Sequence, residues 1–306
     1  MVARIIFVVL LLLSQSSFGQ KEKTYVQKIP GTTKSFTMVA IPDGKFTIGS
    51  KSILADKDET PTADVELSSF WIAEHEVTFG EWDAYFKDQS LPQTKTMDGI
   101  TRATPQYIDL TWGMGRDANN PVNSLSQQAA TMYCQWLYSK TGIFFRLPTE
   151  AEWEYACKAG ETKSIDPSTL SSIAWFADNG AAKFHLVKEK QPNAWGLFDM
   201  LGNLSEWTLD QYDPNYYQTI SKKDPITTPG ARYPRTARGG SYLDAANQLR
   251  CSNRISSEPK WNQRDPQIPK SRWWLTDGMF VGFRVVRPAI QPSAEEAEKF
   301  FRTYLK

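Results

Sequence analysis

The chain has 306 residues, and its 35 basic and 34 acidic residues give a formal charge of +1 at pH 7. This balance leaves no net field for attracting nucleic acid or anionic lipid, so neither is an expected partner. The 18 Gly, 18 Pro and 39 aromatic residues (11 Trp, 12 Tyr, 16 Phe) indicate many turns and a core of scattered aromatic side chains. No internal repeat or low-complexity linker divides the chain, which predicts one compact, loop-rich domain.

The first 19 residues are typical of a secretory signal peptide. Arg4 supplies a positive charge, residues 5–13 are all apolar, and Ser17 and Gly19 are small residues at the positions that a signal peptidase reads. The apolar run is too short to span a bilayer, and no later stretch is long and apolar enough to do so. We expect cleavage just before Gln20 and a secreted or periplasmic protein without a membrane span or lipid anchor.

Short strands are expected from residue 36 onward. Residues 36–50 predict two of them around a turn at 42–44, and residues 65–77 contain another. Near the end of the domain, residues 239–242 and 281–286 are expected to form core strands. The polar segments 51–63 and 210–234 and the irregular segment 89–123 are predicted to be loops.

Four helices begin at capping signals. The first and third follow Thr78 and Thr149, each with a glutamate three residues later that can close a capping box. The second begins at Ser126 and is stopped by Gly142. A capped, amphipathic helix is expected to end the chain after Ser293.

The stretch 192–207, P-N-A-W-G-L-F-D-M-L-G-N-L-S-E-W, interrupts every apolar run with Gly or Asn. A loop that turns this often while buried needs a partner for its inward carbonyls. Asp199 and Glu206 can supply carboxylate oxygens, and the Gly202 and Leu204 carbonyls lie between them, as calcium prefers. The alternative is a buried turn held by Asn and Asp side chains.

Six motifs follow one another in a specific order. They are G-K-F-T-I-G at 44–49, E-V-T at 76–78, R-L-P-T-E-A-E-W-E-Y-A at 146–156, the stretch 196–207, R-G-G-S at 238–241 and G-F-R at 282–284. Together they resemble the formylglycine-generating enzyme family, also called the sulfatase-modifying factor domain. The resemblance covers residues 36–288, leaving residues 20–35 as an N-terminal extension and 289–306 as a C-terminal helix.

This resemblance implies an α+β, C-type-lectin-like fold with little regular secondary structure, short sheets and a few helices. It also implies structural calcium, held by the side chains of Asp199 and Glu206 and the carbonyls of Gly202 and Leu204.

The family oxidises a substrate cysteine to formylglycine with two cysteines that hold Cu(I), because soft thiolates select this ion. The first of these positions falls on Asp244 and the second within residues 246–249, and neither carries a cysteine. Copper and the formylglycine reaction are therefore not expected. Asp244 is instead expected in a ligand-binding groove, where Arg250 and Arg254 could pair with it or with a ligand carboxylate.

The three cysteines of the chain suggest a structural role. Cys157 and Cys251 match positions that form a disulfide in some family members, and Cys134 matches a half-cystine whose partner position is Val285. The resemblance therefore implies a Cys157–Cys251 disulfide and a buried, unpaired Cys134 in a secreted protein. Three reduced, buried cysteines are the alternative.

Other chemistry has little support in the sequence. His75 and His185 are the only histidines, so the chain alone cannot build a three-histidine iron or zinc site. The run W-W-L-T-D at 273–277 is either a stacking platform for a sugar or peptide or a set of packed core aromatics.

Two functions follow from these observations. The first is a noncatalytic, extracytoplasmic domain that binds a peptide or a protein partner of the cell envelope in its groove. The alternative is an oxidoreductase of the same family, acting in sulfatase maturation or a related oxidation from a displaced active site.

Overall fold

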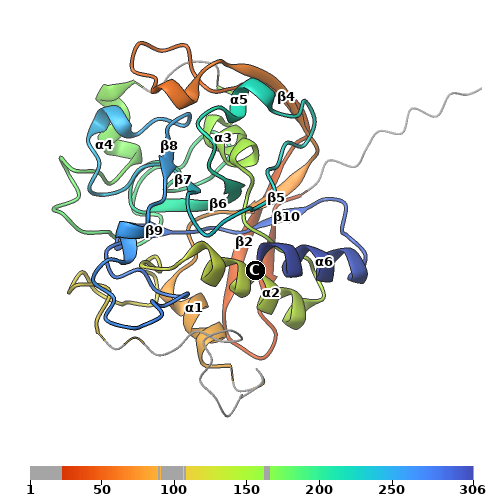
Figure 1. Ribbon diagram of the computed structural model, residues 1–306, viewed down its shortest axis with the longest axis vertical. Helices are drawn as coiled ribbons and strands as arrows, with labels where there is room; N and C mark the ends of the chain where they lie inside the picture. The colour runs from red at the N-terminus through yellow and green to blue at the C-terminus, as the bar shows by residue number, and fades with distance from the viewer. Residues whose placement is uncertain (1–22, 89, 91–105, 107, 162–165, 306) are drawn as a thin grey trace, which may run out of the picture.

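In the part of the chain that the structure describes, three small sheets and a few helices pack around a core rich in aromatic side chains (Figure 1). The computed structural model describes residues 23–88, 90, 106, 108–161 and 166–305, so the expected signal peptide and most of the segment 89–107 lie outside the described part. The strands are β1 (Tyr25–Lys28), β2 (Ser35–Ile41), β3 (Gly44–Ile48), β4 (Ala63–Leu67), β5 (Phe70–Ala73), β6 (Ser205–Gln211), β7 (Arg235–Arg238), β8 (Arg254–Ser256), β9 (Val281–Gly282) and β10 (Val286–Pro288). The α-helices are α1 (Phe79–Phe86), α2 (Gln127–Thr141), α3 (Glu150–Lys158), α4 (Leu170–Ile173), α5 (Tyr216–Thr219) and α6 (Ala294–Tyr304). Short 3₁₀ helices are η1 (Lys57–Glu59), η2 (Pro167–Thr169), η3 (Ala246–Gln248) and η4 (Pro259–Asn262).

The first sheet has the strand order β1-β2-β5-β10 and contains part of the expected N-terminal extension. β1 pairs antiparallel with β2, with Tyr25 opposite Met38, so the domain begins before residue 36. The two strands expected within residues 36–50 are present as β2 and β3, but they belong to different sheets. β3 pairs with β4, which begins at the last residue of the expected loop 51–63 and runs into the segment 65–77.

The other four-stranded sheet has the order β8-β7-β6-β9. The prediction of a strand at residues 239–242 is wrong, because β7 ends at Arg238. The next two residues, Gly239 and Gly240, have φ of 96° and 69°. Both angles lie in the left-handed region that favours glycine. A Cβ at Gly239 would also lie only 2.9 Å from the Met200 carbonyl oxygen, so a larger residue would not fit.

The strand expected at residues 281–286 is divided between two sheets. β9 pairs with β6, whereas β10 pairs with β5 in the first sheet. The chain therefore crosses between the sheets at residues 283–285, and this crossing carries Arg284 into the centre of the molecule.

The expected helices are confirmed. Capping boxes close at Thr78, Thr149 and Ser293, and α2 follows its cap Ser126 and ends at Gly142 with φ of 69°. The segment 210–234 is not wholly an exposed loop, because it begins with the end of β6 and contains α5, whose two tyrosines are buried. Within the part of the chain that the structure describes, no helix is long and apolar enough to cross a membrane.

Of the two hydrophobic clusters among the described residues, the larger one joins α1, α2 and the last strands through aromatic rings. Trp82 contacts Tyr133 and Phe283 at centroid distances of 6.1 and 6.4 Å. Trp273 and Trp274 are only 2% and 3% exposed, so they are packed core residues and not an open stacking platform. The C-terminal helix α6 lies beside α2 (Figure 1) and completes this cluster with buried apolar side chains.

Candidate functional site

The guanidinium of Arg284 organises the turn-rich stretch 192–207 from the inside. It is fully buried and donates hydrogen bonds to the Glu206 carboxylate, with Nη2–Oε1 at 2.6 Å and Nε–Oε2 at 2.7 Å. It also donates to the carbonyl oxygens of Phe198 at 2.9 Å and Asp199 at 3.3 Å. The arginine thus satisfies two of the inward carbonyls for which the sequence required a partner.

Buried carboxylates outnumber this guanidinium. Glu76, Asp199 and Glu206 are all at most 2% exposed. Burial, with Asp199 and Glu206 nearby, raises the pKa of Glu76 well above its usual range. Burial also raises the pKa of Asp199 to about 6. Three ionised carboxylates would carry more negative charge than the single Arg284 guanidinium offsets, and burial disfavours their charged forms further.

Calcium fits this cluster in part. Asp199 Oδ2 accepts a hydrogen bond from the Lys188 N–H at 2.8 Å, but its Oδ1 is buried without a partner and is available as a ligand atom. Glu206, in contrast, has both oxygens in use, because Trp153 Nε1 donates to Oε2 at 2.8 Å beside the two bonds from Arg284. No group of three or more His, Cys, Asp and Glu side chains among the described residues could hold a metal, so the carbonyls of Gly202 and Leu204 would have to supply further ligands. Calcium therefore stays a prediction.

Side chains also hold this loop, as the alternative expected. The Asn203 side chain accepts from the His185 N–H at 2.9 Å and donates to Glu76 at 3.4 Å. Gly202 has a φ of 73°, and a Cβ there would lie 2.1 Å from the Trp175 carbonyl oxygen. The conformation is thus fixed by close backbone packing and by asparagine, in agreement with the Gly and Asn pattern of the sequence.

The structure does not bring the three groove candidates together. Asp244 Oδ2 accepts from the backbone N–H and the hydroxyl of Ser241 at 2.7 and 2.8 Å, and it is partly exposed. Arg250 pairs with Asp56 at 3.1 Å and with Glu59. The expected pairing of Asp244 with an arginine is not found, because the 3₁₀ segment before it turns the Arg250 side chain toward residues 56–59.

Arg254 is a buried structural residue and not a groove residue. Its Nε and Nη2 donate to the two Glu150 oxygens at 2.7 and 2.8 Å, and its Nη1 donates to the carbonyls of Asp58 and Asp213 at 3.0 Å each. The guanidinium also lies over the Tyr217 ring at 4.8 Å. All its donors are directed into the protein, so it is not available to a ligand.

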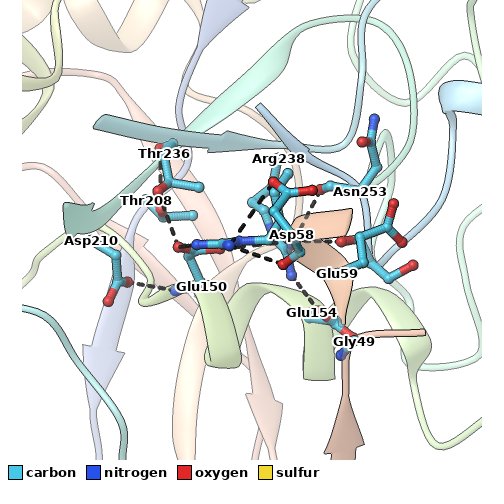
Figure 2. Close-up of polar contacts among 12 residues, drawn as sticks. Gly49, Asp58, Glu59, Glu150, Glu154, Thr208, Asp210, Thr236, Arg238 and Asn253 are labelled. Carbon is cyan, nitrogen blue, oxygen red and sulfur yellow. Dashed lines mark hydrogen bonds and ion pairs between the residues drawn. The ribbon is translucent and has the colours of Figure 1, made fainter. Parts of the chain in front are cut away.

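Arg254 belongs to a buried ion-pair network that the sequence interpretation missed. Figure 2 shows Glu150 and Glu154 of α3 pointing toward Arg238 and the loop with Asp58 and Glu59. Glu154 binds Arg238 and also accepts from the Gly49 N–H at 2.8 Å. Both glutamates are fully buried. The signal was present in the run T-E-A-E-W-E-Y, where two glutamates four residues apart share one face of a helix.

This network predicts a specific pH dependence. Burial and the nearby Glu150 raise the pKa of Asp210 to about 7, whereas an unfolded aspartate has a pKa of about 3.9. The folded protein therefore binds more protons than the unfolded chain between these values, and the contribution of Asp210 to the free energy of unfolding falls as pH rises through this window. The free energy of unfolding, measured with urea at pH 5, 6, 7 and 8, should therefore decrease less steeply with pH in Asp210→Asn than in wild type.

The experiment compares how steeply the free energy of unfolding changes with pH, and not its absolute value, because the substitution also changes hydrogen bonding. Asp210 accepts from the backbone N–H groups of Glu150 and Thr227, and the amide cannot accept both. Glu76 is present in both proteins, so its contribution to the pH dependence cancels when the two are compared. Identical slopes would contradict the assignment to Asp210.

The cysteine prediction is confirmed. Cys157 at the end of α3 is bonded to Cys251, and Cys134 is a free, buried thiol on α2. Burial raises the pKa of the Cys134 thiol well above its usual range, so this thiol stays protonated at neutral pH. The chain thus has no second thiol with which a thiolate pair could form.

Short sheets, an aromatic core and a buried ion-pair network define an α+β fold shared with solved structures. PvdO from Pseudomonas aeruginosa superposes with a TM-score of 0.67 and 26% identity over 88% of this chain and 100% of that chain. Treponema denticola variable protein 1 superposes with a TM-score of 0.64 and 22% identity over 87% and 99%, which shows the fold alone. Residues 24–268 match the sulfatase-modifying factor enzyme 1-like domain, and the chain belongs to this family.

Proteins similar in sequence to this chain are named as formylglycine-generating enzymes, as an inactive enzyme of that name and as protein kinases. A formylglycine-generating enzyme of Streptomyces coelicolor is 30% identical over 273 residues, covering 72% of this chain and 84% of that protein. An inactive C-alpha-formylglycine-generating enzyme 2 of Bos taurus is 24% identical over 278 residues, covering 75% and 85%. A serine/threonine-protein kinase pkn1 of Chlamydia pneumoniae is 31% identical over 250 residues, covering 80% of this chain but only 38% of the kinase. The relatives thus include a protein named as an enzyme and one named as inactive.

Proposed function

We propose that this chain is a noncatalytic, extracytoplasmic sulfatase-modifying factor domain that binds a peptide or a protein partner of the cell envelope beside Asp244. The main support for this proposal is the state of the three cysteines. The family resemblance implies that the first redox position falls on Asp244, Cys157 and Cys251 are joined, and Cys134 is buried and protonated. A linear copper site needs two accessible thiolates, and these residues do not supply them.

Secretion is supported by two independent features. The first 19 residues have the charge and apolar pattern of a signal peptide. The disulfide is typical of proteins that fold in an oxidising compartment. Together they favour a location outside the cytoplasm, where envelope proteins and their peptides are accessible.

The surface beside Asp244 offers the mixture of groups that a peptide requires. The Asp244 carbonyl accepts from the Ala177 N–H at 3.0 Å, which places the loop after α4 next to it. In this loop Trp175 stacks on His185 at 3.8 Å, and Lys190 Nζ lies 3.6 Å from the Trp175 ring centre. Leu243 is 47% exposed beside the partly exposed carboxylate. Aromatic, apolar and charged groups therefore adjoin one another, as in peptide-binding surfaces.

A photocrosslinking amino acid at position 243 tests this surface. Crosslinked envelope proteins or peptides are expected from position 243 and should decrease in the Asp244→Ala background. Ile290, which is 84% exposed, provides the matched control position. Equal crosslinking at 243 and 290, or none at 243 in the envelope fraction, would contradict the proposal.

The alternative function is an oxidoreductase of the same family with a displaced active site, which the resemblance to a formylglycine-generating enzyme favours. Anaerobic Cu(I) titration with the disulfide intact, followed by aerobic incubation with a sulfatase-motif cysteine peptide, distinguishes the two functions. We expect no stoichiometric thiolate–copper complex and no aldehyde product, either in wild type or in Asp244→Cys, which still lacks a second thiolate. Conversion of the peptide by wild type would overturn the noncatalytic proposal.

We also propose that calcium stabilises the loop around Asp199. An ion that binds the folded state alone raises stability by about 2.7 kcal/mol when its free concentration is 100 times the Kd. Thermal unfolding with increasing calcium should show a saturable rise in Tm that a chelator reverses, and Asp199→Ala should abolish the rise. Glu66→Ala, which removes a surface carboxylate, serves as the control. Equal midpoints with calcium and with chelator would show that Arg284 and Asn203 suffice to hold the loop.

A further inference from the structure

A small cavity at the start of α2 is lined by three arginines and no carboxylate. Its volume is about 60 Å³. Arg235 comes from β7, whereas Arg232 and Arg272 lie on the loops that precede β7 and follow η4. The remaining lining residues are Ser126, Gln127, Gln128, Trp207, Tyr233, Leu275 and Tyr304.

Arg235 is the unusual member of this group. It is only 8% exposed, and its Nη1 is buried without a hydrogen-bond partner among the described residues. Burial lowers its pKa to about 10, so the guanidinium is still charged at neutral pH. The other buried arginines that the structure describes, such as Arg238, Arg254 and Arg284, each pair with a glutamate. A buried, unpaired charge is expensive, which calls for an anionic partner from outside the chain.

The two arginines at the mouth are exposed and also lack an acidic partner among the described residues. Arg232 Nη2 donates to the Ser271 carbonyl, and Arg272 Nε donates to the Gln128 side-chain oxygen at 3.0 Å. Each guanidinium has five N–H donors, so both retain donors for a ligand. Three positive charges thus surround one cavity.

Helix α2 adds to this positive potential. Ser126 is its N-cap, and Gln127 and Gln128 are its first two residues. The first backbone N–H groups of a helix have no acceptor within the helix and carry partial positive charge, which favours an anion. This contribution supplements the arginines and would not define a site alone.

We propose that this cavity binds a tetrahedral oxyanion, a phosphate or a sulfate group, with Arg235 at its floor and Arg232 and Arg272 at its mouth. A cavity needs roughly 10–15 Å³ for each water molecule, so 60 Å³ suits a group of four oxygens around one central atom. A doubly charged oxyanion matches three guanidinium groups better than a carboxylate does. Asp244 does not line this cavity, so the proposal is independent of the groove.

Titration of the full chain with inorganic sulfate and phosphate at constant ionic strength tests the proposal. Both anions also stabilise proteins non-specifically at high concentration, so the diagnostic result is a rise in Tm that saturates in the low millimolar range or below. Acetate should give at least a tenfold weaker effect. Methyl phosphate provides a second arm, in which tighter binding than inorganic phosphate indicates a group carried on a larger molecule and equal binding indicates a free ion.

Two substitutions make the outcome decisive. Arg235→Gln should abolish the saturable rise and, in anion-free buffer, should have a higher Tm than wild type, because it removes an uncompensated buried charge. Gln128→Glu retains the side-chain shape and supplies Arg272 with an internal carboxylate, so it should weaken anion binding at least tenfold.

Arg302→Gln removes one positive charge from an exposed pair with Glu298 and should bind like wild type. A wild-type response that is linear with anion concentration, or a saturable response that Arg235→Gln and Gln128→Glu both retain, would overturn the proposal.

Discussion

Replacing Glu150 by glutamine is expected to lower the free energy of unfolding by about 3–5 kcal/mol. Glu150 is fully buried and accepts hydrogen bonds from Arg254 at 2.7 and 2.8 Å and from the Thr236 hydroxyl at 3.0 Å. Burial raises the pKa of Glu150, but the charges and hydrogen bonds of Arg254, Arg238 and Thr236 together lower it below its usual value, so the carboxylate is ionised in the folded protein. Glutamine retains the shape of the side chain but removes the charge, and buried Arg254 then keeps only the more distant Asp58 carboxylate, whose Oδ2 lies 3.9 Å from Nη1.

Urea unfolding at pH 7 measures this loss, which corresponds to a decrease in Tm on the order of 10 °C for a domain of this size. Glu66→Gln is the matched control. Glu66 pairs with Lys45 at 3.5 Å, and the two side chains are 45% and 79% exposed. The control should stay within about 0.5 kcal/mol of wild type. Equal effects of the two substitutions would show that the buried network contributes no more than a surface pair.

Removing the disulfide is expected to lower the free energy of unfolding by about 2–5 kcal/mol. Cys157 and Cys251 are 94 residues apart in sequence, so their bond restricts a long segment of the unfolded chain. The double variant Cys157→Ser/Cys251→Ser should therefore melt at a lower temperature than wild type. A reductant should lower the Tm of wild type toward that of the variant and leave the variant unchanged.

Thiol titration provides an independent check of the pairing. The denatured wild-type protein should react with one equivalent of thiol reagent before reduction and three after, and mass mapping should place the single free thiol on Cys134. Three reactive thiols before reduction would contradict the pairing. So would a reductant that lowers the Tm of the double variant as much as that of wild type.

These predictions separate the scaffold from the function. Glu150, Arg254 and the disulfide hold α3 against β8 and the segment before it, and they are independent of any ligand. The proposed binding surface beside Asp244 and the proposed anion site in the arginine-lined cavity instead concern binding, and each has its own test. The proposed binding function therefore rests on a scaffold whose stability can be measured separately, on a fold that hosts more than one function.

Local signals in the sequence determined much of the fold. The helices after Thr78, Thr149 and Ser293 are confirmed, and the capping boxes expected at Thr78 and Thr149 close, because the cap and the glutamate that closes each box are only three residues apart. The αL residue Gly142 ends α2 for an equally local reason. The ordered motifs identified the family and, through it, the Cys157–Cys251 pairing, which no local rule could have supplied.

Tertiary structure alone decided which charges meet. Arg284 binds Glu206, which is 78 residues away in sequence, and Arg254 binds Glu150, which is 104 residues away. The hydrophobic periodicity around each arginine therefore does not indicate which glutamate it will bind. Sequence proximity suggested that Arg254 would pair with Asp244, but β8 carries its side chain into the interior beside α3. The division of residues 281–286 between two sheets likewise depends on strands elsewhere in the chain. Burial makes an unpaired charge costly, so each buried arginine is stable only beside a carboxylate. Which carboxylate this is depends on the tertiary fold, because only the fold brings distant segments together.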